Sequence, residues 1–166
     1  MIEYEKGCCI KVAKSKNKNV VIPHIVNDAG FWGSGVVMAI SKEWPISLED
    51  RSPEYIYRNY LTMLGQVEVI RTNLDKPVIY VANMCAQKGI DSLKSTGNKK
   101  YHNSKPIRYS SLVKCMEQVK ATFNPNHVEI VAPKFGSLRS GGNWDFIEEL
   151  IDEIWKDFKV TVCEYE

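Results

Sequence analysis

The sequence has no long apolar run and almost no excess of charge of either sign. No stretch of about 18 apolar residues occurs, which argues against a membrane-spanning helix. The 22 lysines and arginines nearly balance the 20 aspartates and glutamates, so a formal net charge of +2 supplies no general field for holding nucleic acid. We therefore expect no membrane partner and no general binding of nucleic acid.

Cysteine is present without the spacing of a metal or disulfide site. The five cysteines are odd in number, none belongs to a Cys-x-x-Cys pair, and no histidine follows at the spacing of zinc ligands. We interpret them as reduced thiols that act as small core hydrophobes, and expect neither a metal nor a cofactor. The charged segment Met1–Lys6 does not resemble a signal peptide, so we expect a cytoplasmic protein, and a monomer.

Short runs of β-branched residues alternate with segments of helical periodicity. Pro23 lies inside one such run and predicts a bulge or a sheet edge, because proline cannot donate to a strand ladder. The alternation predicts one layered α/β domain over 1–166, with helices on both faces of the sheet and a mobile polar loop at 91–105. The strand candidates are 20–26, 67–70, 78–82, 128–132 and 160–163, with a weaker one at 8–12, and the helix candidates are 36–44, 53–64, 109–122 and 143–158.

Two glycine-rich loops each follow a predicted strand and precede a predicted helix. In the first, Gly30, Gly33 and Gly35 let the backbone approach a ligand closely, and the following helix offers free N–H groups to an anion. The second, residues 135–144, leads into a helix that Asn143 caps. Each loop alone could be a tight turn. Together they could face each other across a crevice and hold a diphosphate through backbone amides.

Five segments together resemble the macrodomain family of ADP-ribose-binding modules. They are Ile22–Asn27, Trp32–Gly35, Val81–Ile90, Pro106–Tyr109 and Gly141–Trp144, in the family's order and over nearly the whole chain. The likeness is closest to the branch of ADP-ribose 1″-phosphate phosphatases and terminal ADP-ribose glycohydrolases. It implies a three-layer α/β/α fold with a mixed, mostly parallel sheet of about six strands. It also implies that the partner is ADP-ribose or a derivative, free or carried by a modified protein.

The resemblance further implies which residues surround the distal ribose and the diphosphate. Asn27 would bind the distal ribose hydroxyls, and Asn83, Met84 and Gln87 would border the same ribose. The remaining implied contacts are Gly33, Ser34, Gly35 and Val36 in the first loop, and Gly136, Ser137, Leu138, Arg139, Ser140 and Gly141 in the second.

The adenine end departs from the family's pattern. Many macrodomains have an aspartate near the N-terminus that accepts from the adenine amino group, and Cys8 stands there, followed by Cys9. Adenine recognition would then rest on backbone groups, on Asp28 or on stacking. Tyr165 could stack on the base, or it could be a plain surface tyrosine.

His24 is the sharpest candidate for catalysis. It stands at the end of a predicted strand beside the first loop, and the pKa of histidine suits proton transfer near pH 7. Asn27 and Asp28 complete the catalytic candidates, Asp28 as a carboxylate that could activate water. The alternative is a histidine buried in the sheet for structural reasons. In the phosphatase branch that the chain resembles, a histidine stands at about this place.

Three functions stay open at this stage. The first is a hydrolase that acts, without a metal, on ADP-ribose 1″-phosphate or a related ADP-ribosyl bond. For the glycohydrolase branch Lys88 is near the expected nucleophile, but Ser140 stands where an acid is expected. The second is a module that only binds ADP-ribose or related nucleotides. The third is an RNA-binding module that would use the lysines of the polar loop, Lys94, Lys99, Lys100 and Lys105.

Overall fold

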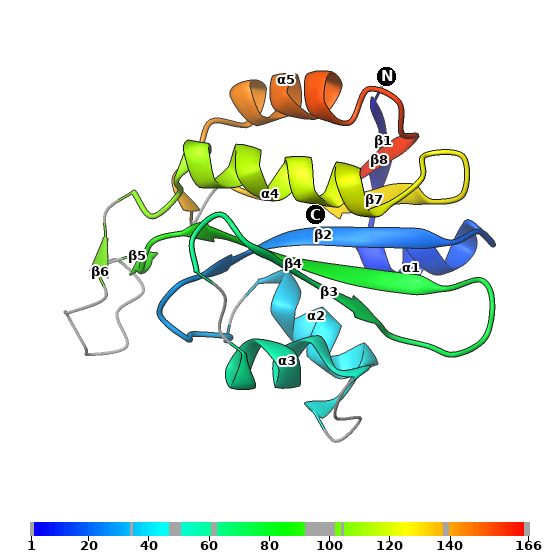
Figure 1. The fold of residues 1–166 in the computed structure, drawn as a ribbon, viewed down its shortest axis with the longest axis horizontal. Helices are drawn as coiled ribbons and strands as arrows, with labels where there is room; N and C mark the ends of the chain where they lie inside the picture. The colour runs from blue at the N-terminus through cyan, green and yellow to red at the C-terminus, as the bar shows by residue number, and fades with distance from the viewer. Residues whose placement is uncertain are drawn as a thin grey trace.

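The computed structural model describes residues 2–33, 35–46, 51–60, 63–91, 102–103, 105–137 and 140–164. A six-stranded sheet of order β1-β8-β7-β2-β4-β3 forms its centre, and all neighbours are parallel except β3 and β4. Its strands are β1 (Ile2–Lys6), β2 (Val20–Asn27), β3 (Val67–Arg71), β4 (Ile79–Gln87), β7 (Glu129–Pro133) and β8 (Val160–Glu164). The helices of the described residues are α1 (Cys9–Ser15), α2 (Val36–Glu43), α3 (Pro53–Asn59), α4 (Tyr109–Thr122) and α5 (Trp144–Ile154). Helices α4 and α5 lie on one side of the sheet and α2 and α3 on the other (Figure 1). The three-layer fold with a mixed, mostly parallel sheet is confirmed.

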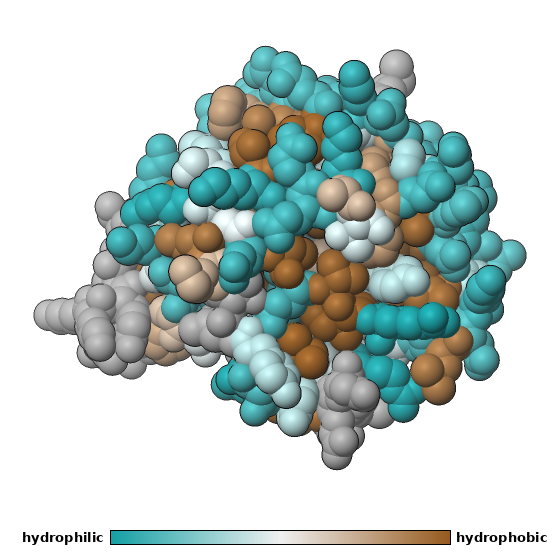
Figure 2. All heavy atoms as spheres, in the orientation of Figure 1, coloured by the Kyte–Doolittle hydropathy of each residue, from teal (hydrophilic) through white to brown (hydrophobic). Residues whose placement is uncertain are grey.

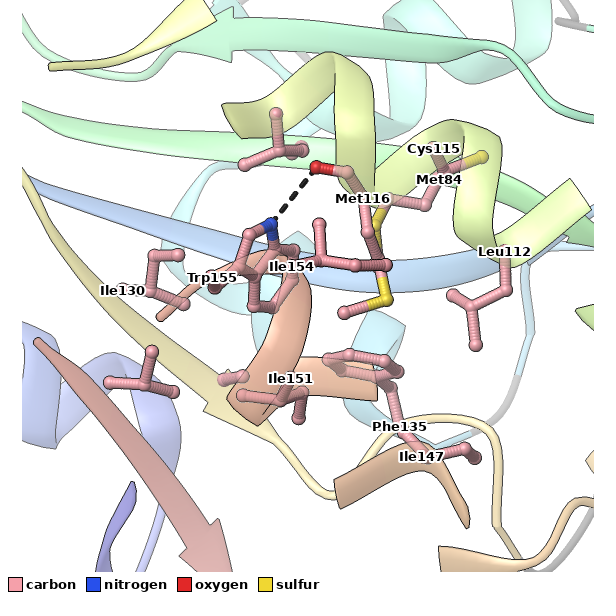
Figure 3. Close-up of a cluster of buried hydrophobic side chains, with 14 of the residues drawn as sticks. Met84, Leu112, Cys115, Met116, Ile130, Phe135, Ile147, Ile151, Ile154 and Trp155 are labelled. Atoms are coloured by element: carbon pink, nitrogen blue, oxygen red, sulfur yellow. Dashed lines mark hydrogen bonds between the residues drawn. The ribbon is translucent and has the colours of Figure 1, made fainter. Parts of the chain in front are cut away.

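The face under α4 and α5 holds the larger apolar core. Trp155 fills its centre, and its indole Nε1 donates to the carbonyl of Met116 on α4 at 2.9 Å (Figure 3). Ile147, Ile151 and Ile154 present the inner face of α5 to this core. Each such buried side chain contributes about 1.5–3 kcal/mol of hydrophobic free energy.

The opposite face packs on α1, α2 and α3. Its core joins residues of α1 and α2 to Val20, Ile22 and Val26, the even-numbered positions of β2. Side chains of a strand alternate between faces, so Val21 and Ile25 belong to the other core. The central strand β2 is therefore apolar on both sides, as its sequence predicts.

Several predictions of local structure were wrong. Residues 8–12 were predicted as a weak strand, but Cys8 caps α1, whose buried residues Cys9, Ile10, Val12 and Ala13 have helical spacing. The edge strand β1 was not predicted, because its residues 3–6 are exposed and carry no apolar alternation. Helix α3 ends at Asn59 instead of 64.

Pro23 is neither at a sheet edge nor at the bulge. It lies in central β2, and the register irregularity comes later, between Val26 and Asn27. Pairing with β7 covers only Val20 and Val21, so no β7 partner lies opposite the proline. The strand tolerates Pro23 because the ladder on that side has already ended.

The predicted mobile loop at 91–105 lies mostly outside the described residues. Its ends form two short parallel strands, β5 (Ile90–Asp91) and β6 (His102–Asn103). Lys94, Lys99 and Lys100 lie outside the described residues.

Candidate functional site

A cleft of about 1780 Å³ opens at the carboxyl ends of the parallel strands. The first glycine loop and the start of α2 form one wall, and the second glycine loop forms the other. Gly7, Cys9 and Glu164 border one part of it, and Gln87 and Ile90 border it at the end of β4. The two loops therefore enclose one cavity, as the sequence predicts.

Asn27 holds the first loop in shape from the end of β2. Its side-chain Oδ1 accepts from the backbone N–H of Ala29 at 3.0 Å and of Phe31 at 3.2 Å. Its Nδ2 donates to the carbonyl of Phe31 at 2.7 Å, which leaves the second Nδ2 hydrogen for another acceptor. Asn27 is only 7% exposed, so most of its polar capacity supports the loop.

Tyr57 anchors the same loop from α3. Its hydroxyl lies 2.7 Å from the carbonyl of Asn27 and 2.9 Å from Asn27 Oδ1, and accepts from the N–H of Gly30 at 3.1 Å. Burial raises the pKa of Tyr57 well above its usual value, so the hydroxyl keeps its proton. Sequence reasoning did not identify Tyr57, because it reaches the loop from 30 residues away and no local pattern marks that contact.

The glycines of the first loop face empty space. Among the described residues, a Cβ built on Gly30, Gly33 or Gly35 would meet no atom within 4 Å other than those of its chain neighbours. Gly35 caps α2 with φ +77°, a conformation that glycine adopts without strain. Val36, at the start of α2, also borders the cleft, whereas Ser34 lies outside the described residues.

The second loop packs its glycines against protein. The N–H of Gly142 donates to the carbonyl of Gly136 at 2.8 Å, which closes the loop on itself. Ser137 Oγ donates to the carbonyl of Lys134 at 2.9 Å. Gly136, Ser137 and Ser140 line the cleft, and Gly141 is exposed. Leu138 and Arg139 lie outside the described residues.

The residues of β4 divide between the cleft and the interior. Gln87 lines the cleft, and its Oε1 accepts from Ser140 Oγ at 2.8 Å, which ties β4 to the second loop. The structure does not bring Met84 to the cleft: it is fully buried in the core under α4 (Figure 3). Asn83, also fully buried, faces His24 instead. The alternation of side chains along β4 turns Met84 and Asn83 to opposite faces of the sheet.

His24 lies in β2, below the first loop, with no exposed surface although it borders the inner wall of the cleft. Its Nε2 lies 2.6 Å from Asn83 Oδ1, so the proton sits on Nε2 and is donated. Trp32 meets the ring edge-on at 5.5 Å, and Nδ1 has no partner among the described residues. Burial lowers the pKa of His24 from 6.5 to about 4, so the ring is neutral at pH 7. Its role as a general acid or base stays a prediction.

Asp28 joins the first loop to the end of β4. Its Oδ1 accepts from the N–H of Gly89 at 2.8 Å, and its own N–H donates to the carbonyl of Gln87 at 3.0 Å. Within the described ranges, Oδ2 accepts no hydrogen bond. Asp28 is half-buried and is not among the residues that line the cleft, although Asn27 and Gly30 on either side of it are. One of its carboxylate oxygens is fixed, and the other can accept from water.

The expected adenine end is lined by thiols and by side chains that the sequence did not single out. Cys9 borders the cleft but is buried, and burial raises the pKa of its thiol to about 12. Cys8 is half-buried at the start of α1. Lys134 lies 5.6 Å over the ring of Trp144 and 3.5 Å from Glu164. Tyr165 lies outside the described residues.

All five cysteines are free thiols in the structure. Across the described ranges, no three His, Cys, Asp or Glu side chains gather in a way that could hold a metal ion. None of the helices found in those ranges is long and apolar enough to cross a membrane. Of the loop lysines, Lys105 is described, and its Nζ lies 5.7 Å over the ring of Tyr109.

The chain is similar to known proteins over its whole length, although no family model matches it. It is 24% identical over 170 residues to the ADP-ribose 1″-phosphate phosphatase of Lodderomyces elongisporus, covering 98% of this chain and 99% of that relative. A solved structure of a protein of unknown function from Bacteroides thetaiotaomicron has a TM-score of 0.75 and 32% identity, covering 98% and 97% of the two chains. A macrodomain protein from Streptomyces coelicolor has a TM-score of 0.73 and 27% identity, covering 100% of both.

Proposed function

Because the chain has the fold of a macrodomain and is similar over its length to an ADP-ribose 1″-phosphate phosphatase, we propose that its cleft binds ADP-ribose or a derivative. The observation that carries this proposal is the empty space over Gly30, Gly33 and Gly35. Glycines that pack against nothing in the protein leave room for a ligand to approach the backbone closely. The opposite wall adds backbone N–H groups of the second loop, which suit a diphosphate.

We propose further that the chain hydrolyses ADP-ribose 1″-phosphate. The relative from Lodderomyces elongisporus, named for that activity, aligns over nearly all of both chains. In such a reaction water attacks the phosphorus, the bond to the ribose oxygen breaks, and that oxygen takes up a proton. The protein must therefore orient a water molecule and hold the ribose.

Asp28 is the residue that we propose for orienting the water. The N–H of Gly89 fixes Oδ1, and Oδ2 is left to accept a hydrogen bond from water. Asn27 would donate its second Nδ2 hydrogen to a hydroxyl of the distal ribose, which is the role that the resemblance implies for it.

For His24 we propose a positioning role in place of direct proton transfer. The neutral ring donates to Asn83 Oδ1, and Asn83 Nδ2 lies 3.3 Å from the carbonyl of Pro53 at the start of α3. His24 thus links the central strands to the helix that carries Tyr57, and Tyr57 fixes Asn27. Direct proton transfer would require a substrate oxygen to reach a ring that has no exposed surface.

A module that only binds is the second candidate, and the burial of His24 favours it. The histidine is neutral and enclosed, and among the described lining residues no other histidine borders the cleft. This candidate predicts ADP-ribose binding without turnover of the 1″-phosphate or of ADP-ribosylated protein.

The experiment that separates the two is an Asp28→Asn substitution. Calorimetry would measure ADP-ribose binding, and release of inorganic phosphate from ADP-ribose 1″-phosphate would measure turnover. We expect turnover to fall about 100-fold, as for the loss of a general base, while the binding constant stays within a few-fold. Asp75→Asn, which changes an exposed carboxylate in the β3–β4 connection, is the matched control. Unchanged turnover in Asp28→Asn would show that Asp28 takes no part in the reaction. If the parent chain showed no turnover, the function would be that of a module that only binds.

A further inference from the structure

Strand β3 ends the sheet, so one side of its backbone has no neighbouring strand. Two hydrogen bonds show which of its groups face β4: Thr72 N–H donates to Ile79, and Cys85 N–H donates to the carbonyl of Gln66. Residues two apart in a strand direct their backbone groups to the same side. Even-numbered residues from 66 to 72 therefore pair with β4.

The odd-numbered residues Val67, Val69 and Arg71 consequently point their N–H and C=O groups away from the sheet. In the part of the chain that the structure describes, these groups form no hydrogen bond outside the sheet. An unpaired row of this kind is a template for another extended chain.

A separate cavity of about 510 Å³ lies along this edge. Its apolar side chains reach the surface, since Val69 is 38% and Leu74 69% exposed. Hydrophobic residues are exposed among hydrophilic ones where β3 runs across the near face of the molecule (Figure 2). The lining residues are Arg51, Ile56, Val69, Ile70, Arg71 and Leu74.

The only charged residues of this lining are two arginines. Arg71 is fixed by two neutral acceptors, the carbonyls of Asn73 at 2.9 Å and Leu74 at 2.8 Å, so its charge is positioned without being neutralised. Arg51 forms no ion pair with any described acidic side chain. Glu68, the acid within β3, is not part of the lining.

We propose that the edge of β3 binds an extended acidic peptide of a partner protein. The peptide adds a strand beside Val67, Val69 and Arg71. On the face that it turns to the groove, residues two apart set an apolar side chain on Ile56, Val69 and Leu74 and carboxylates on Arg51 and Arg71. The charge favours this occupant over a second copy of the chain, which would bring the same two arginines to the groove. The groove shares no lining residue with the large cleft, so both can be occupied at once.

The test measures fluorescence anisotropy of a labelled Val-Thr-Glu-Thr-Glu peptide, whose valine and glutamates share one face of the strand, with the full chain. We expect saturable binding that persists with ADP-ribose present and is lost when the peptide's backbone nitrogens are methylated. Replacing its glutamates by lysines should also abolish binding. Equal binding of the methylated peptide, or displacement by ADP-ribose, would overturn the proposal.

Two variants locate the site. Val69→Pro removes an outward N–H without removing a bond to β4, and should abolish binding of the peptide. Arg51→Gln should weaken binding about fivefold, because it removes one charge pair with the peptide, and it leaves strand β3 unchanged. Lys120→Gln on α4 is the control. Unchanged binding in both variants, or a dimer of the parent chain that Val69→Pro dissociates, would contradict a peptide partner.

Discussion

The two glycine loops that face each other across the cleft are built in opposite ways. Buried polar groups outside the loop tip hold the first loop, chiefly Asn27 and the hydroxyl of Tyr57, and its glycines face empty space. The second loop is held by its own backbone, and two of its glycines, Gly136 and Gly142, face protein. A Cβ on Gly142 would lie 2.2 Å from the carbonyl oxygen of Gly136, and one on Gly136 would lie 2.6 Å from Ile147 Cδ1.

The difference shows that one residue type serves two purposes in one site. At positions 136 and 142 of the second loop glycine is needed for folding, because any side chain would displace backbone or core atoms. In the first loop Gly33 has an ordinary conformation and free space, so folding does not require it. The comparison therefore predicts that substitutions in the two loops affect different properties.

The largest effect is expected for Gly142→Ala. The new methyl group would overlap the carbonyl of Gly136, a backbone atom that cannot rotate away, so we expect a loss of about 3 kcal/mol in the free energy of unfolding. Urea unfolding followed by circular dichroism measures it. A loss below about 0.5 kcal/mol would show that the second loop is not closely packed.

Acidification should lower the stability of the protein through His24, which lies below the first loop. Burial lowers the pKa of His24 to about 4 in the folded state, so between pH 6.5 and 4 the unfolded chain binds a proton that the folded chain does not. The stability that the neutral His24 contributes is therefore fully present above pH 6.5 and is lost as the pH falls toward 4. The contribution of His24 amounts to about 2 kcal/mol between pH 7.5 and 5.0.

Urea unfolding at several pH values would test this, with His24→Gln to isolate the contribution. The pH dependence should be shallower in His24→Gln and unchanged in His127→Gln, which alters an exposed histidine at the other end of the sheet. An equal slope in parent and His24→Gln would contradict the assignment.

Tyr57→Phe removes the hydroxyl that links α3 to the first loop. Gly30 N–H and Asn27 would each lose their hydrogen bond to this hydroxyl. We therefore expect about 1 kcal/mol less stability, and ADP-ribose binding weakened a few-fold. Calorimetry and urea unfolding measure the two effects. Tyr60→Phe, at an exposed tyrosine one residue beyond α3, should change neither.

The smallest effect on stability is expected for Gly33→Ala. Its methyl group would meet no protein atom, so the free energy of unfolding should stay within about 0.5 kcal/mol. ADP-ribose affinity should fall about tenfold, because the methyl group occupies space that the ligand needs. Parent-like affinity in a stably folded Gly33→Ala would place the ligand elsewhere in the cleft.

The sequence predicted those parts of the fold that local patterns determine. The helix at 109–122 coincides with α4, and the strand at 20–26 with all but the last residue of β2, because their apolar spacing is complete within the segment. The segment at 8–12 failed since a short buried helix and a buried strand both appear as an apolar run. Strand β1 offers no apolar alternation, and only pairing with β8 makes it a strand.

The site was predictable to the level of its two loops. Their glycines, caps and flanking elements are adjacent in the chain, so their meeting at one cleft follows from parallel strands. The hydrogen bonds of Tyr57 with Asn27 and of Ile107 with Ser140 join distant segments and appear only in the folded chain. The neutral state of His24 likewise follows from its complete burial in the folded chain, which lowers its pKa, while the hydrogen bond to Asn83 acts in the opposite direction.

The parallel pairing of β1 with β8 has a practical consequence. The register runs from Ile2 opposite Val160 to Lys6 opposite Glu164, and Glu164 borders the cleft. A fusion or surface attachment before Ile2 would leave from the end of the sheet away from the cleft. The same attachment at the carboxyl end would stand beside the pocket mouth. Immobilisation through the amino end is therefore the arrangement that keeps the cleft open to large ligands.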